Sequence, residues 1–360
     1  MSSEALGRVS VLVTAVGAPG AAGIISALRR NGERETSVFG VDMNSQASGK
    51  ALVDGFSKVP KGNDPGFIDD IIDASHEFDV GVILPLSTEE LLAFASAKDR
   101  IRESTGAVTV VSAKDAIAAS NEKGKLFTRL ASAGVPVPEH SVVRSPAQLR
   151  RACAELGHPG LPVCMKPSFA HGGRGFRVIE DSAPTDDTLL RRKPESASIS
   201  LVEAERLLAG LESPPEMLVM EFLPGREYSV DLLCSKGEML VAIPRSRDEI
   251  RSGISFRGTV VDRDDAVDVC RRVCDTMEFD GPIGVQFRED RDGALKVLEI
   301  NPRLHGSVAL SVAAGVNVPY LAVKGALNEP FDIPPIRYGT TMTRYWGATF
   351  HDKDGLPHTL

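Results

Sequence analysis

The sequence predicts an α/β domain followed by an α+β region whose sheets are mostly antiparallel. Three observations lead to this fold class. The chain has 360 residues, enough for two or three domains of the usual size of roughly 150 residues. Up to about residue 120, apolar runs typical of strands alternate with helical segments, as in a parallel sheet with crossover helices. Beyond that point, strand-like runs follow one another as hairpins.

The first region, residues 1–120, is predicted to be one N-terminal parallel α/β domain. Its strand-like runs are Val9–Val16, Ser37–Asp42, Val80–Leu86 and Ala107–Ser112. A helix follows the first run and extends to about Asn31, and a short helix is expected at Lys114–Ser120. The alternation indicates crossover connections, because parallel neighbours cannot be joined by a tight turn.

The second region begins at Asn121, where the pattern changes. A helix over Lys123–Ala133 stops at Gly134–Pro138, because two prolines forbid its continuation. Further helices are expected at Glu203–Leu211 and Asp264–Met277. The strand-like runs are Leu161–Pro167, Phe176–Glu180, Met217–Leu223, Tyr228–Cys234, Met239–Pro244, Ile283–Arg288 and Ala294–Ile300. The last two runs are predicted to form a hairpin that turns at Glu289–Gly293.

The composition argues against several classes of protein. Hydrophobic residues make up 42% and charged residues 25%, as in an ordinary folded domain. The net charge of −8 argues against a general nucleic-acid binder, which needs a basic face. The longest apolar runs, such as Val9–Val16, are far shorter than the ~20 residues that cross a bilayer. The first residues, MSSEALGR, contain no apolar run of the kind found in signal peptides.

The five cysteines indicate no disulfide framework in a chain of this length, so a reduced, cytoplasmic protein is expected. Cys270 and Cys274 have a spacing that a metal site could use. Together with Val267 and Met277, however, they form an apolar stripe with helical spacing. We therefore expect one buried helix face rather than a metal pair.

A first glycine loop, Gly17–Gly23, follows a predicted strand and opens a helix. Asp42 ends the next strand, where a ribose-binding acid would lie in a dinucleotide-binding domain. The spacing of the glycines is not G-x-G-x-x-G, however, and Pro19 removes one backbone N–H. A tight strand-to-helix turn is the favoured interpretation, and dinucleotide binding remains the alternative.

A second glycine loop lies beside a lysine at the end of a strand. Lys166-Pro167 ends that strand, and the loop consists of His171, Gly172, Gly173, Arg174 and Gly175. Glycines let backbone N–H groups approach phosphate oxygens, and the two cationic side chains add positive charge. A flexible hairpin turn would explain the glycines alone. The lysine beside them favours an anion-binding loop.

A third cluster combines oxygen ligands with an arginine. Glu299 and Asn301 are two residues apart on one predicted strand and therefore point to the same face. Gln286 lies on the partner strand of the hairpin and can face them, so three oxygens would converge as Mg²⁺ prefers. Arg303 follows in phase. A solvated polar face is the competing interpretation, but these residues interrupt an otherwise apolar strand.

A fourth segment, Met220–Glu227, contains a strand that ends in a Pro-Gly turn. Such an ending predicts unpaired backbone groups at Glu221 and Leu223, which could bind the edge of adenine, while Glu227 could accept ribose hydroxyls. A plain strand–turn–strand with exposed acids explains the same residues equally well.

Together, in this order, these elements resemble the ATP-grasp superfamily, and within it the carbamoyl-phosphate-synthase-like branch of carboxylate ligases. The resemblance covers nearly the whole chain. Asn121-Glu122-Lys123 with Gly134–Pro138 resembles the family's entry to its ATP-binding lid, Met165–Pro167 its lid strand and His171–Gly175 its phosphate loop. Met220–Leu223 resembles the adenine hinge and Glu227 the ribose acid. Gln286, Glu299 and Asn301 match the metal positions, and Leu298–Arg303 is the most specific block.

Two features depart from the family. Gln286 is neutral where many members place a carboxylate, although this branch tolerates glutamine. With only Glu299 charged, metal affinity without nucleotide should be low. The chain also has one ATP-grasp unit and is too short for a complete carbamoyl phosphate synthase.

The resemblance implies an ATP-grasp fold in three parts. Residues 1–120 would form the N-terminal α/β domain, 121–222 the linker helix and lid, and 223–360 the antiparallel catalytic subdomain with the metal site. The lid, over about Leu161–Glu216, is expected to be mobile and to become ordered with ATP. The implied cofactors are ATP and Mg²⁺, with Mn²⁺ as an alternative ion.

The resemblance also implies a reaction. A carboxylate would attack the γ-phosphate of ATP, and an amine would then displace phosphate from the acyl phosphate to form an amide. Lys123 and Lys166 would hold the α- and β-phosphates. The catalytic residues would be Arg303, Lys166 and Asn301. The implied ATP-binding residues are Lys123, Lys166, His171, Gly172, Gly173, Arg174, Gly175, Glu221, Phe222, Leu223, Glu227 and Leu298.

Acceptor recognition is assigned to Arg245, Arg251 and the turn that begins at Ser252-Gly253, together with Arg303. Both arginines could direct a guanidinium fork at a carboxylate. A solvated charged loop over residues 245–251 is an equally good interpretation. His305 is expected to be a polar neighbour of the site rather than a base.

Other functions remain as alternatives. An NAD(P)-dependent oxidoreductase would use Gly17–Gly23, and a kinase-like enzyme would stop at phosphorylation of a carboxylate or bicarbonate. A non-catalytic nucleotide-binding subunit is disfavoured by the intact Lys166, Glu299, Asn301 and Arg303. The expected partners are a small-molecule carboxylate and an amine, with neither nucleic acid nor membrane. The identity of both substrates stays open, as does the oligomeric state, with a homodimer as one option.

Overall fold

The computed structural model describes residues 6–169, 175–180, 198–251, 253–345, 347–353 and 355–358. The chain forms two compact units. Unit 1 comprises Met1–Ala118, Glu227–Gln286 and Ile300–Leu360, and unit 2 comprises Ala119–Arg226 and Phe287–Glu299. Among the helices of the described ranges, none is long and apolar enough to span a membrane.

The N-terminal part of unit 1 contains a five-stranded sheet in the order β3-β2-β1-β4-β5, with every pair parallel. The predicted parallel α/β domain is thus confirmed. The strands are β1 (Val9–Val13), β2 (Thr36–Asp42), β3 (Gly55–Lys58), β4 (Val82–Leu84) and β5 (Val108–Thr109). Strand β3 is not predicted from the sequence, because it contains no long apolar run.

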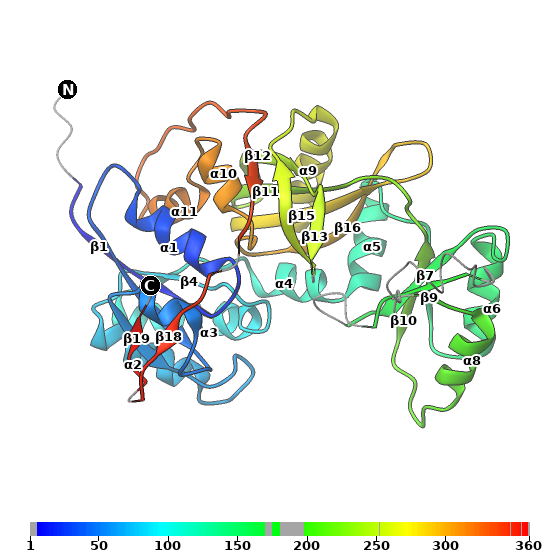
Figure 1. Cartoon of the computed structure of the whole chain (residues 1–360), viewed down its shortest axis with the longest axis horizontal. Coiled ribbons are helices and arrows are strands. Elements are labelled where there is room, and N and C mark those ends of the chain that lie inside the picture. The colour runs from blue at the N-terminus through cyan, green and yellow to red at the C-terminus, as the bar shows by residue number, and fades with distance from the viewer. Residues whose placement is uncertain are drawn as a thin grey trace. The chain divides into compact units, whose positions relative to one another are not determined.

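Helices cover both faces of this sheet (Figure 1). Alternate residues of β1 serve the two layers: Val11 and Val13 pack with Ile24 of α1, whereas Leu12 packs with α2 and α3. The period of two in a strand explains this division. The helical segments are α1 (Ala21–Arg29), η1 (Ser48–Leu52), α2 (Phe67–Glu77), α3 (Leu91–Thr105) and α4 (Lys114–Asn121).

The remainder of unit 1 is built on a sheet in the order β12-β11-β15-β16, in which β11 and β12 form an antiparallel hairpin. The strands are β11 (Glu227–Ser235), β12 (Glu238–Ser246), β15 (Gly281–Glu289) and β16 (Leu295–Asn301). The last two belong in part to each unit. A smaller sheet contains β13 (Glu249–Arg251), β14 (Ile254–Thr259) and β17 (Thr341–Thr343), and a hairpin joins β18 (Phe350–His351) to β19 (Pro357–His358).

The helices of this part are α9 (Asp264–Met277), α10 (Ala309–Ala313) and α11 (Val318–Ala326). Helix α9 has the bounds that the sequence predicts. Its Cys270 and Cys274 are buried with Met277, which confirms the expected apolar helix face. The Cys274 Sγ lies 3.1 Å from the Sγ of Cys234, and all five cysteines are free thiols.

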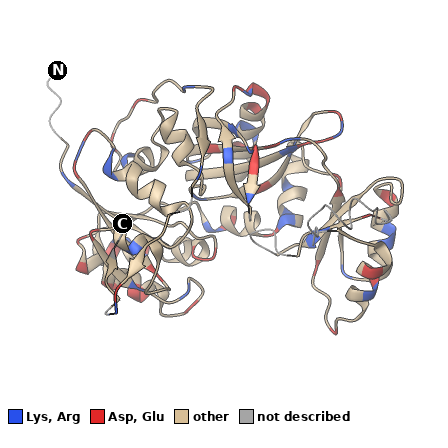
Figure 2. Ribbon diagram, viewed as in Figure 1, with Lys and Arg blue, Asp and Glu red and all other residues tan. Residues whose placement is uncertain are grey.

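Unit 2 contains a five-stranded sheet in the order β6-β10-β7-β8-β9. Its strands are β6 (His140–Val143), β7 (Val163–Pro167), β8 (Arg177–Ile179), β9 (Ser198–Ile199) and β10 (Met217–Glu221), and its helices are α5 (Lys123–Ser132), α6 (Pro146–Glu155) and α8 (Leu201–Ala209). Strand β6 and helix α6 are not among the elements predicted from the sequence, although Ser145 caps α6 and Pro146 occupies its first turn, a recognisable start signal. Acidic and basic residues lie side by side on α6 and α8 (Figure 2), where Arg150 pairs with Glu205.

The predicted hairpin over residues 283–300 is confirmed. Its turn is closed by the Asp290 N–H, which donates to the Ala294 carbonyl at 2.9 Å. Gly293 has a φ of +82°, which a glycine adopts without strain. This hairpin carries Gln286, Glu299 and Asn301.

Candidate functional site

Two lysines of unit 2 are held in a desolvated environment. Lys123 begins α5 and is buried, and Lys166 lies on β7 and is partly buried, with its Nζ 5.7 Å from the centre of the Phe127 ring. Burial lowers the pKa of Lys123, although the charge of Glu299 opposes the shift. Burial and the charge of Lys123 lower the pKa of Lys166 to about 8, again against the effect of Glu299. An added anion would stabilise both ammonium groups.

The segment predicted to bind adenine needs one correction. Unpaired backbone groups are predicted at Glu221 and Leu223, but the Glu221 N–H is paired, because it donates to the Glu139 carbonyl at 2.9 Å. The Glu221 carboxylate accepts the Glu139 N–H in return, at 3.0 Å. Strand β10 is thus paired to its end, a pairing to residue 139 that local sequence does not reveal. Leu223 is buried, and Phe222 lies under the Arg288 guanidinium at 5.8 Å.

Of the predicted phosphate loop, His171, Gly172, Gly173 and Arg174 lie outside the described residues, and so does Ser252 of the predicted acceptor turn. Gly175 is described and has a φ of +73°. A Cβ on this residue would lie 2.7 Å from Pro167 Cδ. Both observations require glycine at this end of the loop.

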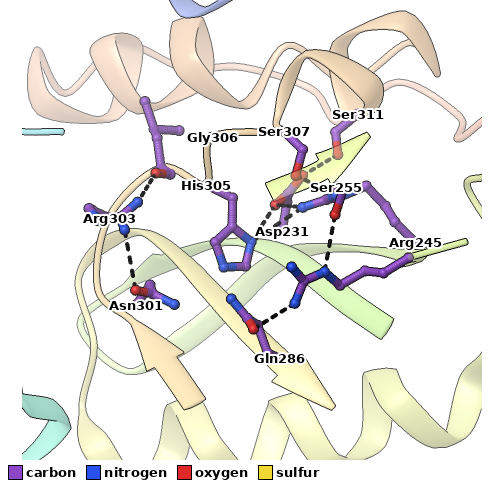
Figure 3. Close-up of polar contacts among 12 residues, drawn as sticks. Asp231, Arg245, Ser255, Gln286, Asn301, Arg303, His305, Gly306, Ser307 and Ser311 are labelled. Carbon is purple, nitrogen blue, oxygen red and sulfur yellow. Dashed lines mark hydrogen bonds and ion pairs between the residues drawn. The ribbon is translucent and has the colours of Figure 1, made fainter. Parts of the chain in front are cut away.

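Residues of the predicted metal set belong to different units. Glu299 lies in unit 2, beside Leu298 on β16, and both side chains are partly exposed. Gln286 and Asn301 lie in unit 1 (Figure 3). In unit 1, Asn301 Oδ1 accepts from Arg303 Nη2 at 3.3 Å. Among the described residues, His, Cys, Asp and Glu form no group of three that could hold a metal.

Arg303 also contacts the N-terminal α/β part of unit 1. Its Nε donates to Thr88 Oγ1 at 3.0 Å, in the loop that follows β4. In the same loop, Glu90 is buried and accepts a hydrogen bond from Thr14, which directly follows β1. Burial raises the pKa of Glu90 to about 7, although hydrogen bonds from Thr14 and the backbone oppose it. Glu90 carries no recognisable signal in the sequence, because its burial depends on contacts between distant segments.

Arg247 is the functional candidate that sequence analysis missed. Its Nη1 donates to Gln286 Oε1 at 2.8 Å and lies 3.2 Å from Glu227 Oε2. Its Nε donates to Ser255 Oγ at 3.1 Å, and its Nη2 to the Gly253 carbonyl at 2.7 Å. The side chain is only 7% exposed. The Arg247 guanidinium therefore contacts residues predicted to bind three different ligands: Glu227 the ribose, Gln286 the metal and Gly253 the acceptor substrate.

The structure corrects the interpretation of Arg245. Its side chain is fully buried and forms a 2.6 Å ion pair with Asp231. A second nitrogen donates to Ser307 at 2.8 Å. Arg245 therefore does not direct a guanidinium fork at a substrate, and it is not part of a solvated loop. Arg251 is exposed on β13, pairs with Glu249 at 2.7 Å and stacks 3.7 Å above the Phe256 ring.

His305 belongs to the same interior cluster, in which His305 and Ser311 contact Asp231 while Ser307 accepts a hydrogen bond from Arg245 (Figure 3). The charge of Arg245 and a hydrogen bond from His305 lower the pKa of Asp231 well below its ordinary value, although burial alone would raise it. The Nδ1 of His305 lies 3.0 Å from the ionised Asp231, so Nδ1 carries the proton. Burial lowers the pKa of His305 itself, against the hydrogen bond to Asp231. The opposite edge of the ring faces Gly284, where a Cβ would lie 2.0 Å from Nε2.

The first glycine loop packs against the chain itself. A Cβ on Gly20 would lie 2.4 Å from Gly306 Cα. Asp42 accepts the Gly17 N–H and the Asn44 N–H, each at 2.8 Å. The glycine and the acid thus have structural partners, in agreement with a tight strand-to-helix turn.

Two family models match the chain. Residues 11–111 match the PylC-like N-terminal domain, and residues 213–347 match "ATP-grasp in the biosynthetic pathway with Ter operon". Residues 213–347 are therefore similar to an ATP-grasp domain. The predicted resemblance and the predicted fold are both confirmed.

Other proteins show the same relationship. The chain is 27% identical over 297 residues to the carbamoyl phosphate synthase large chain of Thermus thermophilus, covering 79% of this chain and 27% of that one. It is also 27% identical over 241 residues to the uncharacterized protein y4rH of Sinorhizobium fredii, covering 63% and 45%. The chain thus spans less than half the length of these relatives.

Solved structures share the fold at lower identity. N5-carboxyaminoimidazole synthetase from Staphylococcus aureus superposes with a TM-score of 0.66 at 17% identity, covering 94% of this chain and 82% of that one. The biotin carboxylase domain of Hydrogenobacter thermophilus 2-oxoglutarate carboxylase, solved with MgADP, ADP and bicarbonate, gives 0.67 at 18% identity, covering 92% and 73%.

Proposed function

We propose that this protein is an ADP-forming ligase that activates a carboxylate as an acyl phosphate and joins it to an amine. The observation that carries the proposal is the lysine pair of unit 2. Burial outweighs the attraction of Glu299 at both Lys123 and Lys166, so each pKa is lowered. A polyphosphate supplies the negative charge that such a site favours.

In this proposal, Lys123 and Lys166 hold the α- and β-phosphates. Phe222 and Leu223 contact the adenine, and Glu227 contacts the ribose. Glu299 and Asn301 would hold Mg²⁺, or Mn²⁺ in its place, and the bound ion would supply positive charge against the phosphates. The oxygen chemistry of a carboxylate and an amide suits such an ion.

The reaction has two steps. A carboxylate oxygen attacks the γ-phosphorus, the bond to the β-γ bridging oxygen breaks, and ADP leaves. The amine nitrogen then attacks the acyl carbon, the C–N bond forms, and phosphate and a proton leave. Arg303 stabilises charge on the transferred group, so the protein contributes positioning and electrostatic stabilisation rather than a covalent intermediate.

The acceptor side is proposed to use Arg251, Gly253 and Arg303, with Ser252 between the first two. Both substrates are small molecules. Arg245 is not included, because its guanidinium is buried against Asp231. The dinucleotide alternative is not favoured, because Gly306 occupies the space beside Gly20.

Product analysis tests the reaction type. Pooled small carboxylates and amino acids are incubated with ATP and Mg²⁺, and the products are identified by mass spectrometry. We expect ADP and phosphate, because the proposed groups surround the terminal phosphates. With the acid alone, hydroxylamine should trap a hydroxamate. Formation of AMP and pyrophosphate would exclude this mechanism, and ADP release that needs no amine would favour the kinase-like alternative.

A further inference from the structure

Arg247 and Gln286 form a contact that bears on how many metal ions the site binds. Gln286 Oε1 is the atom that would ligate a metal, and it accepts a hydrogen bond from Arg247 Nη1 at 2.8 Å. Because a guanidinium only donates, the oxygen of Gln286 must be the atom that faces it. The predicted ligand atom is therefore already bound to a permanent positive charge.

A divalent ion on the same oxygen would experience this charge at close range. At ordinary ligand and hydrogen-bond distances, the ion and Nη1 would be only about 4 Å apart. The Arg247 side chain is 7% exposed, so water screens the repulsion poorly. Gln286 is neutral and cannot offset this repulsion, and Glu227, whose Oε2 lies 3.2 Å from Arg247 Nη1, offsets only part of it.

The contacts of Arg247 also fix its position. Ser255, Gly253 and Glu227 receive its other hydrogen bonds, so the guanidinium is held in place before any ligand arrives. Such preorganised charge stabilises phosphate without the cost of arranging it. Arginine suits this use because its fork matches phosphate geometry.

We propose that the protein binds one divalent ion with its nucleotide, through Glu299 and Asn301, and that Arg247 takes the place of a second ion at Gln286. This inference rests on the proposed function and specifies the charge arrangement of the same site. It assigns Gln286 to orienting Arg247 rather than to ligating metal.

Manganese binding measured by electron paramagnetic resonance provides the test. Mn²⁺ is titrated into protein saturated with a non-hydrolysable ATP analogue, and bound ions are counted per nucleotide. We expect one ion in the wild type. Gln286→Ala should change Mn²⁺ affinity less than about threefold, whereas Glu299→Gln should weaken it at least about tenfold, as loss of a metal-site group does.

Paired variants separate the two roles. Gln286→Glu alone should still bind one ion, because the new carboxylate pairs with Arg247. Arg247→Met with Gln286→Glu should bind two, because the repulsion is gone and a second charged ligand is present. Arg257→Ala, which removes an exposed arginine of β14, is the matched control and should bind one.

Two ions per nucleotide in the wild type, or equal effects of Gln286→Ala and Glu299→Gln, would overturn the inference and leave the ligase proposal intact. Failure of the wild type to bind the analogue at all would overturn both. If Arg247→Met does not fold, the wild-type count and the Gln286→Ala affinity still decide the question.

Discussion

Each unit holds a cluster of charged groups, and the two clusters differ in how far their opposite charges compensate one another. In unit 1, the Asp231 carboxylate faces Arg245 at 2.6 Å and accepts a hydrogen bond from His305. Its pKa is lowered despite burial, so the ionised form is favoured. In unit 2, the charge of Glu299 acts on both Lys123 and Lys166, but burial outweighs it and lowers both pKa values.

The difference distinguishes a structural cluster from a ligand site. A buried pair of opposite charges holds segments together, here β11, β12 and the loop after β16. A cluster with excess charge carries a cost that a ligand of opposite charge removes. The balanced cluster should therefore respond to mutation through stability, and the unbalanced one through binding.

The largest expected effect comes from breaking the balanced cluster. Asp231→Ala leaves the Arg245 guanidinium buried without its counter-charge, which should reduce the free energy of unfolding by about 3–5 kcal/mol. Urea unfolding followed by circular dichroism measures the loss. The double variant Asp231→Leu with Arg245→Met removes both charges and should lose less. Equal losses in the single and double variants would contradict a balanced pair.

The next effect should appear in catalysis with little change in stability. Glu299→Gln removes the carboxylate proposed to hold Mg²⁺ and leaves the lysine charges of unit 2 less compensated. We expect turnover to fall roughly 10²–10³-fold, as when one preorganised electrostatic group is lost. Steady-state ADP release at saturating Mg²⁺ measures this. Glu289→Gln, on the same hairpin, is a comparison variant, and unchanged turnover in Glu299→Gln would refute the assignment.

The two clusters also show which parts of the fold and of the site can be predicted from the sequence. Residue spacing predicted the parallel sheet, helix α9 and the hairpin that carries Glu299, because those patterns are local. It also placed Lys166 beside the glycine loop. It did not predict that Arg245 is buried or that Arg247 donates a hydrogen bond to Gln286. The partner of each arginine lies on another strand, Asp231 on β11 and Gln286 on β15. Two arginines spaced by two residues look alike in sequence, and only tertiary packing separates their roles.

The smallest expected effect is the change in folding stability with pH that the Lys166 side chain causes. Its pKa is lowered from 10.5 to about 8 in the folded chain. Between these values the unfolded chain holds the proton and the folded chain does not, so stability should rise as pH increases from about 8 to 10.5. Lys166→Met should remove this rise and, at pH 7, stabilise the protein by about 1–2 kcal/mol, less than the full shift implies because the side chain is partly exposed.

The affinity for nucleotide should change with pH in the opposite direction to the folding stability. A polyphosphate favours the charged lysine, so the affinity for a non-hydrolysable ATP analogue should fall with rising pH above about 8, the pKa of free Lys166. The decrease should reach at most about tenfold per pH unit. Calorimetric titrations from pH 7 to 9.5 on the wild type and Lys166→Met measure it. The variant should bind more weakly at pH 7 and show a flatter profile. A variant that is both less stable and equally pH-dependent would mean that Lys166 belongs to a balanced structural cluster, as Arg245 does.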